Sequence, residues 1–153
     1  ARAEAELETA SLHNAVPLFT IEPGYPEALA HLEAPPPLIY VKGQQDLLNQ
    51  SAVAIVGARN ASAAGCKLAR TFAAELGQAG LVIVSGLARG IDGAAHTAAL
   101  DHGTIAVVAG GLDIIYPPNT KACNAPSPIK AVSFRKCRAD FSLGQKTSHA
   151  EID

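Results

Sequence analysis

The chain carries AVAIVG at 52–57, LVIVSG at 81–86 and TIAVVAGG at 104–111, three short apolar runs that each end in glycine. Val/Ile runs without polar alternation are typical of strands that are buried on both faces. The segments between them, 62–80 and 90–103, have helical spacing, and such alternation is typical of βαβ units. The pattern predicts an α/β fold, a Rossmann-like parallel sheet with flanking helices.

The first intervening segment has the signals of an amphipathic helix. Ser62 can cap it through its hydroxyl group, and glycines at 77 and 80 offer places to end. We expect an apolar stripe to cover the sheet, made of Leu68, Phe72 and Leu76 with Ala69 and Ala73 between them. The second helix should begin near Gly90, end at Gly103 and approach its strands closely through small residues.

Upstream of these runs the sequence predicts shorter elements. We expect an extended segment at 16–21, a short helix at 25–33, a strand at 38–43 and a turn of helix at 46–49. Three consecutive prolines at 35–37 end the short helix, because the residue before a proline avoids the α region.

Composition narrows the class of protein. A chain of 153 residues fits one domain, and no apolar run approaches the roughly 18 residues of a membrane span. There is no signal-peptide pattern, and the three cysteines lack metal-ligand spacing, so we expect a reduced, cytoplasmic protein. Residues 1–118 carry six Lys/Arg against eleven Asp/Glu, whereas 119–153 carry six against three. An acidic body of this kind does not attract nucleic acid broadly, so anion binding depends on a few placed groups.

Two glycine-containing stretches follow the first two apolar runs and are the candidate anion site. Gly57 lets a ligand approach the backbone, and Arg59 offers a donor fork that matches phosphate. The stretch from Ser85 through Gly86 and Arg89 to Gly90 leads into a helix, whose N-terminal amides favour an anion. A salt bridge from Arg59 to a carboxylate is the alternative. The spacing is not GxGxxG and no ribose-binding acid follows, so we expect no dinucleotide cofactor.

Asp92 and His96 stand four residues apart and can meet on one helix face. They could be an acid–base pair; alternatively, Asp92 favours the helix dipole and orients a packed histidine. We expect no metal site and no catalytic residue set.

The motifs AIVGARNAS (54–62), SGLARGIDGAAHTAAL (85–100), IAVVAGGLD (105–113) and IYPPN (115–119) resemble the bacterial DNA-processing protein A (DprA/Smf) family. Upstream YPEAL and APPPLIYVKG fit the same pattern, so the resemblance spans about 23–119. It implies an extended Rossmann domain that binds single-stranded DNA without catalysis, acts in natural transformation, loads the RecA recombinase and forms homodimers.

Carried over by motif, the DNA- or phosphate-binding residues are Gly57, Arg59, Ser85, Gly86, Arg89, Gly90 and Gly110, with Asp92 and His96 as supporting residues. We expect 1–22 to end a preceding region and 23–118 to be an incomplete Rossmann domain, the N-terminal half of the family's sheet. Residues 119–153 depart from the family and should be an irregular tail.

A shifted reading frame can account for this departure. In the shifted frame, each new codon consists of the third base of one codon and the first two bases of the next. Read in this way, the codons of 134–138 can encode Ser-Glu-Met-Pro and those of 146–153 can encode Asp-Phe-Pro-Arg-Arg-Asn-Arg. Both are motifs of the family, and their separation is suitable. A genuinely divergent tail is the alternative. Two other functional interpretations stay open: a Rossmann enzyme that binds a nucleotide or ribosyl phosphate, and a fragment without function.

Overall fold

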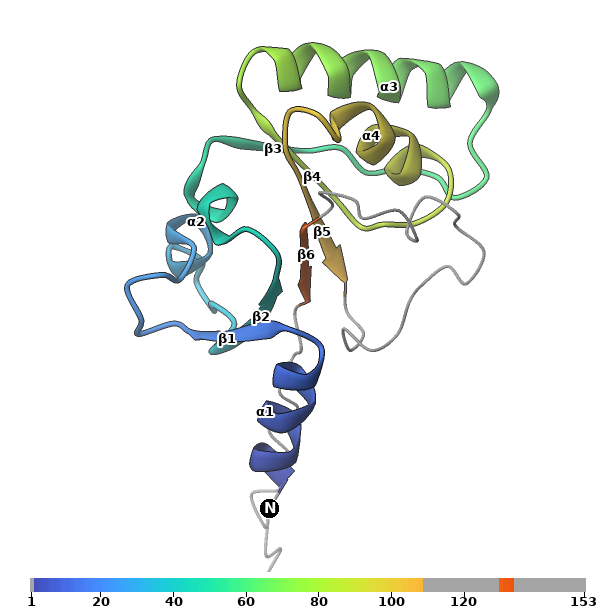
Figure 1. Cartoon of the computed structure of the whole chain (residues 1–153). Helices are drawn as coiled ribbons and strands as arrows, with labels where there is room; N and C mark the ends of the chain where they lie inside the picture. The colour runs from blue at the N-terminus through green and yellow to red at the C-terminus, as the bar shows by residue number, and fades with distance from the viewer. Residues whose placement is uncertain (1, 109–129, 134–153) are drawn as a thin grey trace, which may run out of the picture.

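The computed structural model describes residues 2–108 and 130–133 (Figure 1). Its elements follow one another along the chain as α1 (Arg2–Leu12), β1 (Ala15–Phe19), α2 (Glu27–Ala30), β2 (Leu38–Lys42), the 3₁₀ helix η1 (Gln45–Asn49), β3 (Ala52–Ala54), α3 (Ala63–Gln78), β4 (Val82–Ser85), α4 (Ile91–Ala99), β5 (Thr104–Val108) and β6 (Lys130–Ser133). The elements expected from the sequence are present, although several are shorter.

The strands form one sheet in the order β1-β2-β6-β5-β4-β3. Pairing is parallel from β3 through β4 and β5 to β6, so the predicted α/β fold with a Rossmann-like parallel sheet is confirmed. β1 and β2 pair antiparallel and extend the sheet beyond β6. β6 lies within 119–153, where an irregular tail was expected, so that expectation is wrong for 130–133.

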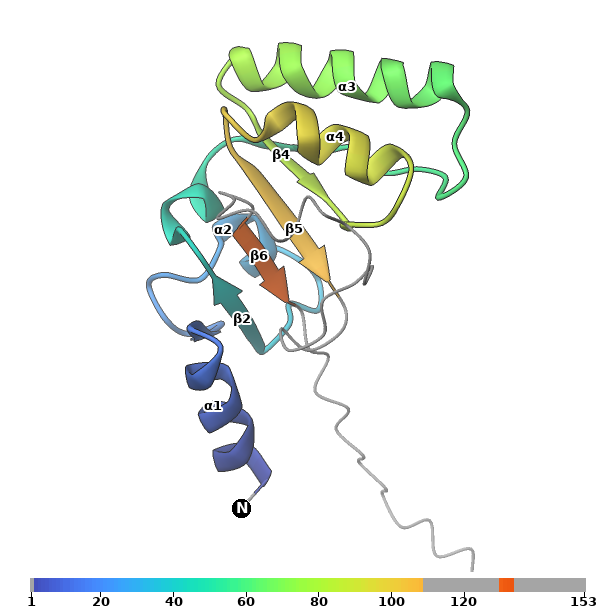
Figure 2. The same ribbon diagram turned by 45° about the vertical axis from the view of Figure 1, so that its right-hand side comes forward.

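The two faces of β4 are covered by different parts of the chain. Ile83 packs with Ala73, Ala95 and Ala99 of α3 and α4, which lie side by side over the sheet (Figures 1 and 2). Val82 points the other way and packs with residues from the first 47 positions and from β5: Leu18, Tyr25, Ile39, Val41, Leu47 and Ile105. The prediction of a strand buried on both faces is confirmed for β4.

For β3 the same prediction is wrong. β3 is the edge strand, Ala52 and Ala54 are exposed, and the Val56 side chain just beyond it is 69% exposed. The apolar run has the composition of a central strand, but among the described residues no strand pairs with its outer edge.

Helix α3 buries part of the predicted stripe, since Ala69 and Ala73 are buried and Leu76 packs on the core, but the prediction is wrong for Leu68 and Phe72. Its buried residues are Ala69, Ala73 and Gly77, whereas the side chains of Leu68 and Phe72 are 54% and 50% exposed. The reason is the close approach to the end of α4: a Cβ atom on Gly77 would lie 2.9 Å from Cβ of His102. Only small residues fit there, so the larger ones point outward. The cap is as expected, since the amide of Gly65 donates to Oγ of Ser62 at 3.1 Å.

Candidate nucleic-acid interface

Two loops at the carboxyl ends of the parallel strands form the candidate site. One follows β3 and carries Gly57 and Arg59, and the other joins β4 to α4 and carries Arg89. Both arginine side chains are exposed. Neither has an ion-pair partner within 2–108 and 130–133, so the described structure does not support the alternative of an Arg59 salt bridge. Ligands of open α/β sheets bind at this edge.

Gly90 holds the two loops together. Its φ of 81° lies in a region that L side chains rarely adopt. A Cβ atom there would collide with the carbonyl oxygen of Ala58 and lie 2.7 Å from that of Arg59. The next amide, of Ile91, donates to the Ala58 carbonyl at 3.3 Å. This contact sets the backbone of Arg59 beside the residue that follows Arg89.

Asp92 ties the same loops from inside. Its carboxylate is buried and accepts hydrogen bonds from the amide of Gly57 at 3.2 Å and of Ala88 at 3.4 Å. A negative charge in the first turn of α4 also favours the helix dipole. Two of the amides that the sequence offered to a phosphate are therefore engaged by the protein's own anion, whereas the two exposed arginine side chains have no ion pair within the described residues.

Ser85 and Gly86 serve the packing of this edge. The buried Ser85 hydroxyl donates to the carbonyl of Ile55 at 2.6 Å and so links the ends of β4 and β3. Gly86 is exposed, and a Cβ atom on it would lie 2.9 Å from Oδ2 of Asp92. The absence of a side chain at this position therefore makes room for the carboxylate.

His96 lies deeper, at the β5 side of α4. Its Nδ1 is 2.7 Å from Oγ1 of Thr104, and that hydroxyl donates to the carbonyl of Ile83 at 2.7 Å. Because the hydroxyl's hydrogen goes to Ile83, Nδ1 of His96 must be the donor. The remaining nitrogen, Nε2, is buried without a hydrogen-bond partner in the described part of the chain. Burial lowers the pKa of His96, and the nearby Asp92 carboxylate and Ser85 backbone oppose this shift.

These contacts show which predicted residues come together. Seven of them lie together at the ends of β3 and β4: Gly57, Arg59, Ser85, Gly86, Arg89, Gly90 and Asp92. His96 lies beneath these residues, and Gly110 falls outside the described residues. Asp92 and His96 are each hydrogen-bonded elsewhere, which fits a packing role better than an acid–base pair.

Sequence reasoning missed Thr104 and Leu87. Thr104 orients His96 across the strand, and Leu87 has a φ of 59°, uncommon for a residue with a side chain. No local pattern signals either one, because each depends on a distant contact or on loop geometry.

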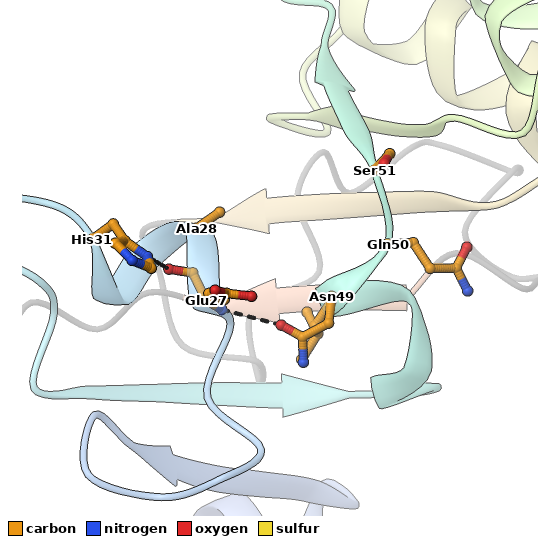
Figure 3. A pocket seen from close by; sticks show the side chains of 7 residues that line it. Glu27, Ala28, His31, Asn49, Gln50 and Ser51 are labelled. Atoms are coloured by element: carbon orange, nitrogen blue, oxygen red, sulfur yellow. Dashed lines mark hydrogen bonds between the residues drawn. The ribbon is translucent and has the colours of Figure 1, made fainter.

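A separate hollow of about 430 Å³ lies at the opposite end of β3 (Figure 3). Its lining residues are Glu27, Ala28, His31, Leu48, Asn49, Gln50 and Ser51. Polar groups there bond one another, since the amide of Glu27 donates to Oδ1 of Asn49 at 3.1 Å and Nδ1 of His31 lies 2.8 Å from the carbonyl oxygen of Glu27. Ser51 precedes β3 whereas Arg59 follows it, so this hollow is not part of the arginine edge.

Residues 2–108 and 130–133 contain no cluster of His, Cys, Asp and Glu that could hold a metal ion. Among the helices described, none has the length and apolar character needed to cross a membrane.

Fold and loops together define a Rossmann-like α/β protein with two exposed arginines at the carboxyl edge of its sheet. Comparison with known proteins agrees with this class. The chain belongs to the DNA recombination-mediator protein A family, whose sequence model matches residues 17–126. The resemblance seen in the glycine motifs is thereby confirmed.

Individual relatives are longer than this chain. The DNA processing protein DprA of Streptococcus pneumoniae is 46% identical over 108 residues, which are 69% of this chain and 38% of the relative. Protein Smf of Escherichia coli is 41% identical over 95 residues, 61% of this chain and 25% of the relative. The chain therefore corresponds to well under half of these proteins.

Two solved structures share the fold. The crystal structure of S. pneumoniae DprA superposes on this chain with a TM-score of 0.74 at 37% sequence identity. The superposed region is 86% of this chain and 47% of the S. pneumoniae chain. DNA processing protein A of Helicobacter pylori, whose structure was described for its mode of binding single-stranded DNA, gives a TM-score of 0.67 at 30% identity and covers 80% and 56%.

Proposed function

We propose that this chain binds the phosphate backbone of single-stranded DNA at the edge formed by Arg59 and Arg89, and acts in DNA uptake and recombination. The observation that carries the proposal is the locking of the two loops through Gly90, which sets on neighbouring loops two exposed guanidinium groups that have no ion-pair partner in the described part of the chain. The H. pylori relative, described for binding single-stranded DNA, supports the choice of ligand.

The charge distribution supports contact with few phosphates. Residues 1–118 carry five more acidic than basic groups, so the surface around the loops does not attract a polyanion broadly. Binding through two arginines should show a shallow salt dependence: with about 0.7 counterions released per neutralised phosphate of a single strand, log K falls with a slope of about −1.4 against log salt.

The proposal includes no catalytic step. Asp92 and His96, the candidate acid–base residues, are buried and hydrogen-bonded within the fold, so neither offers a group to a substrate at the surface. The proposal has four further parts: loading of RecA, formation of homodimers, a cytoplasmic location and a Rossmann domain at 23–118. Membership of the family supports these parts, and we propose no cofactor for the site.

The test is fluorescence anisotropy of a labelled single-stranded oligonucleotide at low salt. Arg59→Ala should weaken binding about tenfold, and Arg89→Ala should do the same, because each removes a charged hydrogen bond worth about 1.5 kcal/mol. Arg70→Ala is the matched control, since Arg70 is exposed on α3 away from both loops. Equal affinity of all three variants would contradict the arginine edge.

Competition separates the proposal from the enzyme alternative. A single-stranded competitor should displace the probe, whereas duplex and a mononucleotide should not. Displacement by a mononucleotide at similar concentration would favour the nucleotide-binding enzyme. A chain that shows no cooperative melting would favour the fragment without function.

A further inference from the structure

A buried carboxylate bridges the two arginine loops. Asp92 is 6% exposed, and its two oxygens accept from the amide of Gly57 on one loop at 3.2 Å and from the amide of Ala88 on the other at 3.4 Å. Gly57 precedes Arg59 by two residues, and Ala88 is next to Arg89. An anion that both guanidinium groups hold therefore comes close to a negative charge that belongs to the protein itself.

No cation cancels this charge in the described part of the chain. There Asp92 makes no ion pair, and its printed partners are the two amides. His96 lies one turn further along α4, but burial lowers its pKa although Asp92 opposes the shift, so its imidazole is neutral at pH 7.5. Two amide hydrogen bonds and the dipole of α4 stabilise the carboxylate without neutralising it.

The carboxylate and the guanidinium groups differ in how strongly solvent screens them. Both arginine side chains are exposed, so water and salt weaken their attraction to any charge they do not contact directly. Asp92 is fixed beneath the loops, where a Cβ atom on Gly86 would lie 2.9 Å from its Oδ2. A lower effective dielectric constant at such a packed position strengthens its field. The arginines therefore favour phosphate oxygens within contact, whereas Asp92 disfavours each added negative charge.

The phosphates of a DNA strand come in two charge states. A diester in the interior of the strand carries one negative charge, shared by two non-bridging oxygens that match the donor fork of a guanidinium group. A terminal monoester carries about −1.5 to −2 at pH 7. Both kinds satisfy the hydrogen bonds of an arginine, but the second charge of the monoester adds repulsion from the carboxylate.

We propose that Asp92 is a specificity-determining residue, which makes the edge formed by Arg59 and Arg89 select the singly charged diester of a strand interior over the doubly charged monoester of a strand end or a free nucleotide. The selection rests on the proposed binding of phosphate at this edge. It adds a reason why the site takes a continuous strand: the interior of the strand presents only diesters.

The experiment compares two ligands of similar size and different charge, thymidine 5′-monophosphate and its methyl ester. Each competes at millimolar concentration with a labelled single-stranded oligonucleotide at pH 7.5 and about 0.1 M salt. We expect the methyl ester to displace the oligonucleotide at roughly threefold to fivefold lower concentration, the effect of one unit charge near a partly screened carboxylate. A monoester that displaces it at equal or lower concentration would overturn the proposal.

Two charge-removing variants assign the selection to Asp92. Asp92→Asn keeps the size of the side chain and an oxygen that can accept from Gly57, so it should raise the affinity for the monoester about threefold relative to the methyl ester. Asp101→Asn is the matched control, because Asp101 is exposed beyond the other end of α4 and the helix spans about 14 Å. Its ratio of the two affinities should equal that of the unchanged chain. An unchanged ratio in Asp92→Asn would contradict the role of its charge.

The selection and the proposed function can fail separately. A monoester that competes as well as the methyl ester, in a chain whose Arg59→Ala variant loses affinity for the oligonucleotide, refutes the selection and leaves the phosphate site. Displacement by neither ligand refutes the phosphate contact and the selection with it. If Asp92→Asn shows no cooperative melting, the two ligands on the unchanged chain still decide, because that comparison requires no substitution.

Discussion

Replacement of Gly90 by alanine tests the contact that holds the arginine loops together. The new methyl group would meet the carbonyl oxygens of Ala58 and Arg59, which are backbone atoms and cannot rotate away. The φ of 81° and ψ of −124° add a conformational cost of about 1–3 kcal/mol for any residue with a side chain. With the collision, we expect Gly90→Ala to destabilise the fold by about 3–5 kcal/mol, unless the loops separate.

Gly80→Ala is the matched control. Gly80 has a similar φ of 87°, but nothing lies within 4 Å of the position of its Cβ. It should therefore cost only the conformational part, about 1–2 kcal/mol. The difference between the two variants isolates the collision at the loops.

Thermal unfolding by circular dichroism measures both variants. We expect a loss in Tm of roughly 10 °C or more for Gly90→Ala and roughly 5 °C for Gly80→Ala, scaled from about 3 °C per kcal/mol for a domain of this size. If the loops separate instead, Gly90→Ala keeps its Tm and loses affinity for single-stranded DNA. Equal Tm losses together with unchanged affinity would refute the reasoning.

Two further predictions follow from the core. The pKa of His96 is lowered by burial, so the unfolded chain binds the extra proton first and stability should fall as pH decreases below about 6.5. His96 contributes at most about 1.4 kcal/mol of unfolding free energy per pH unit. Urea melts between pH 7.5 and 5.5 should show a smaller dependence of unfolding free energy on pH in His96→Gln than in the unchanged chain. Identical pH dependence in both would contradict a lowered pKa for His96. On α3, Phe72→Gln should change stability by less than about 0.5 kcal/mol, whereas Ala73→Leu should cost about 1–3 kcal/mol by overpacking; the reverse order would contradict the exposure of Phe72 and the burial of Ala73.

The reading-frame hypothesis for 119–153 stays a prediction that the coding DNA tests directly. Sequencing should show that a shift of one base near Pro118 restores Ser-Glu-Met-Pro and the arginine-rich motif at their expected separation. A long alternative frame without these motifs would contradict it.

The wrong predictions share a physical cause. For α3, spacing of apolar residues identified the helix and the buried Ala69 and Ala73, but the close approach of α4 and the following turn leaves room there for small residues only, so Leu68 and Phe72 point outward. For β3, the Val/Ile composition indicated a central strand, whereas burial depends on a neighbour whose identity the run itself does not contain. Local patterns record an element's type and leave its partners open.

The sequence by itself determined the parallel α/β framework, the Ser62 cap and the family, because hydrophobic periodicity, capping and glycine motifs are local and repeat in recognisable order. Only the tertiary structure decided which residues at the strand ends pack the two loops together and which stay exposed. Asp92 accepts from the amide of Gly57, and Gly90 packs on the Ala58 carbonyl, both across more than 30 residues of chain to the β3 loop. Such contacts depend on the distance between two loops, which folding alone sets, and in the described part of the chain they leave Arg59 and Arg89 exposed at this edge.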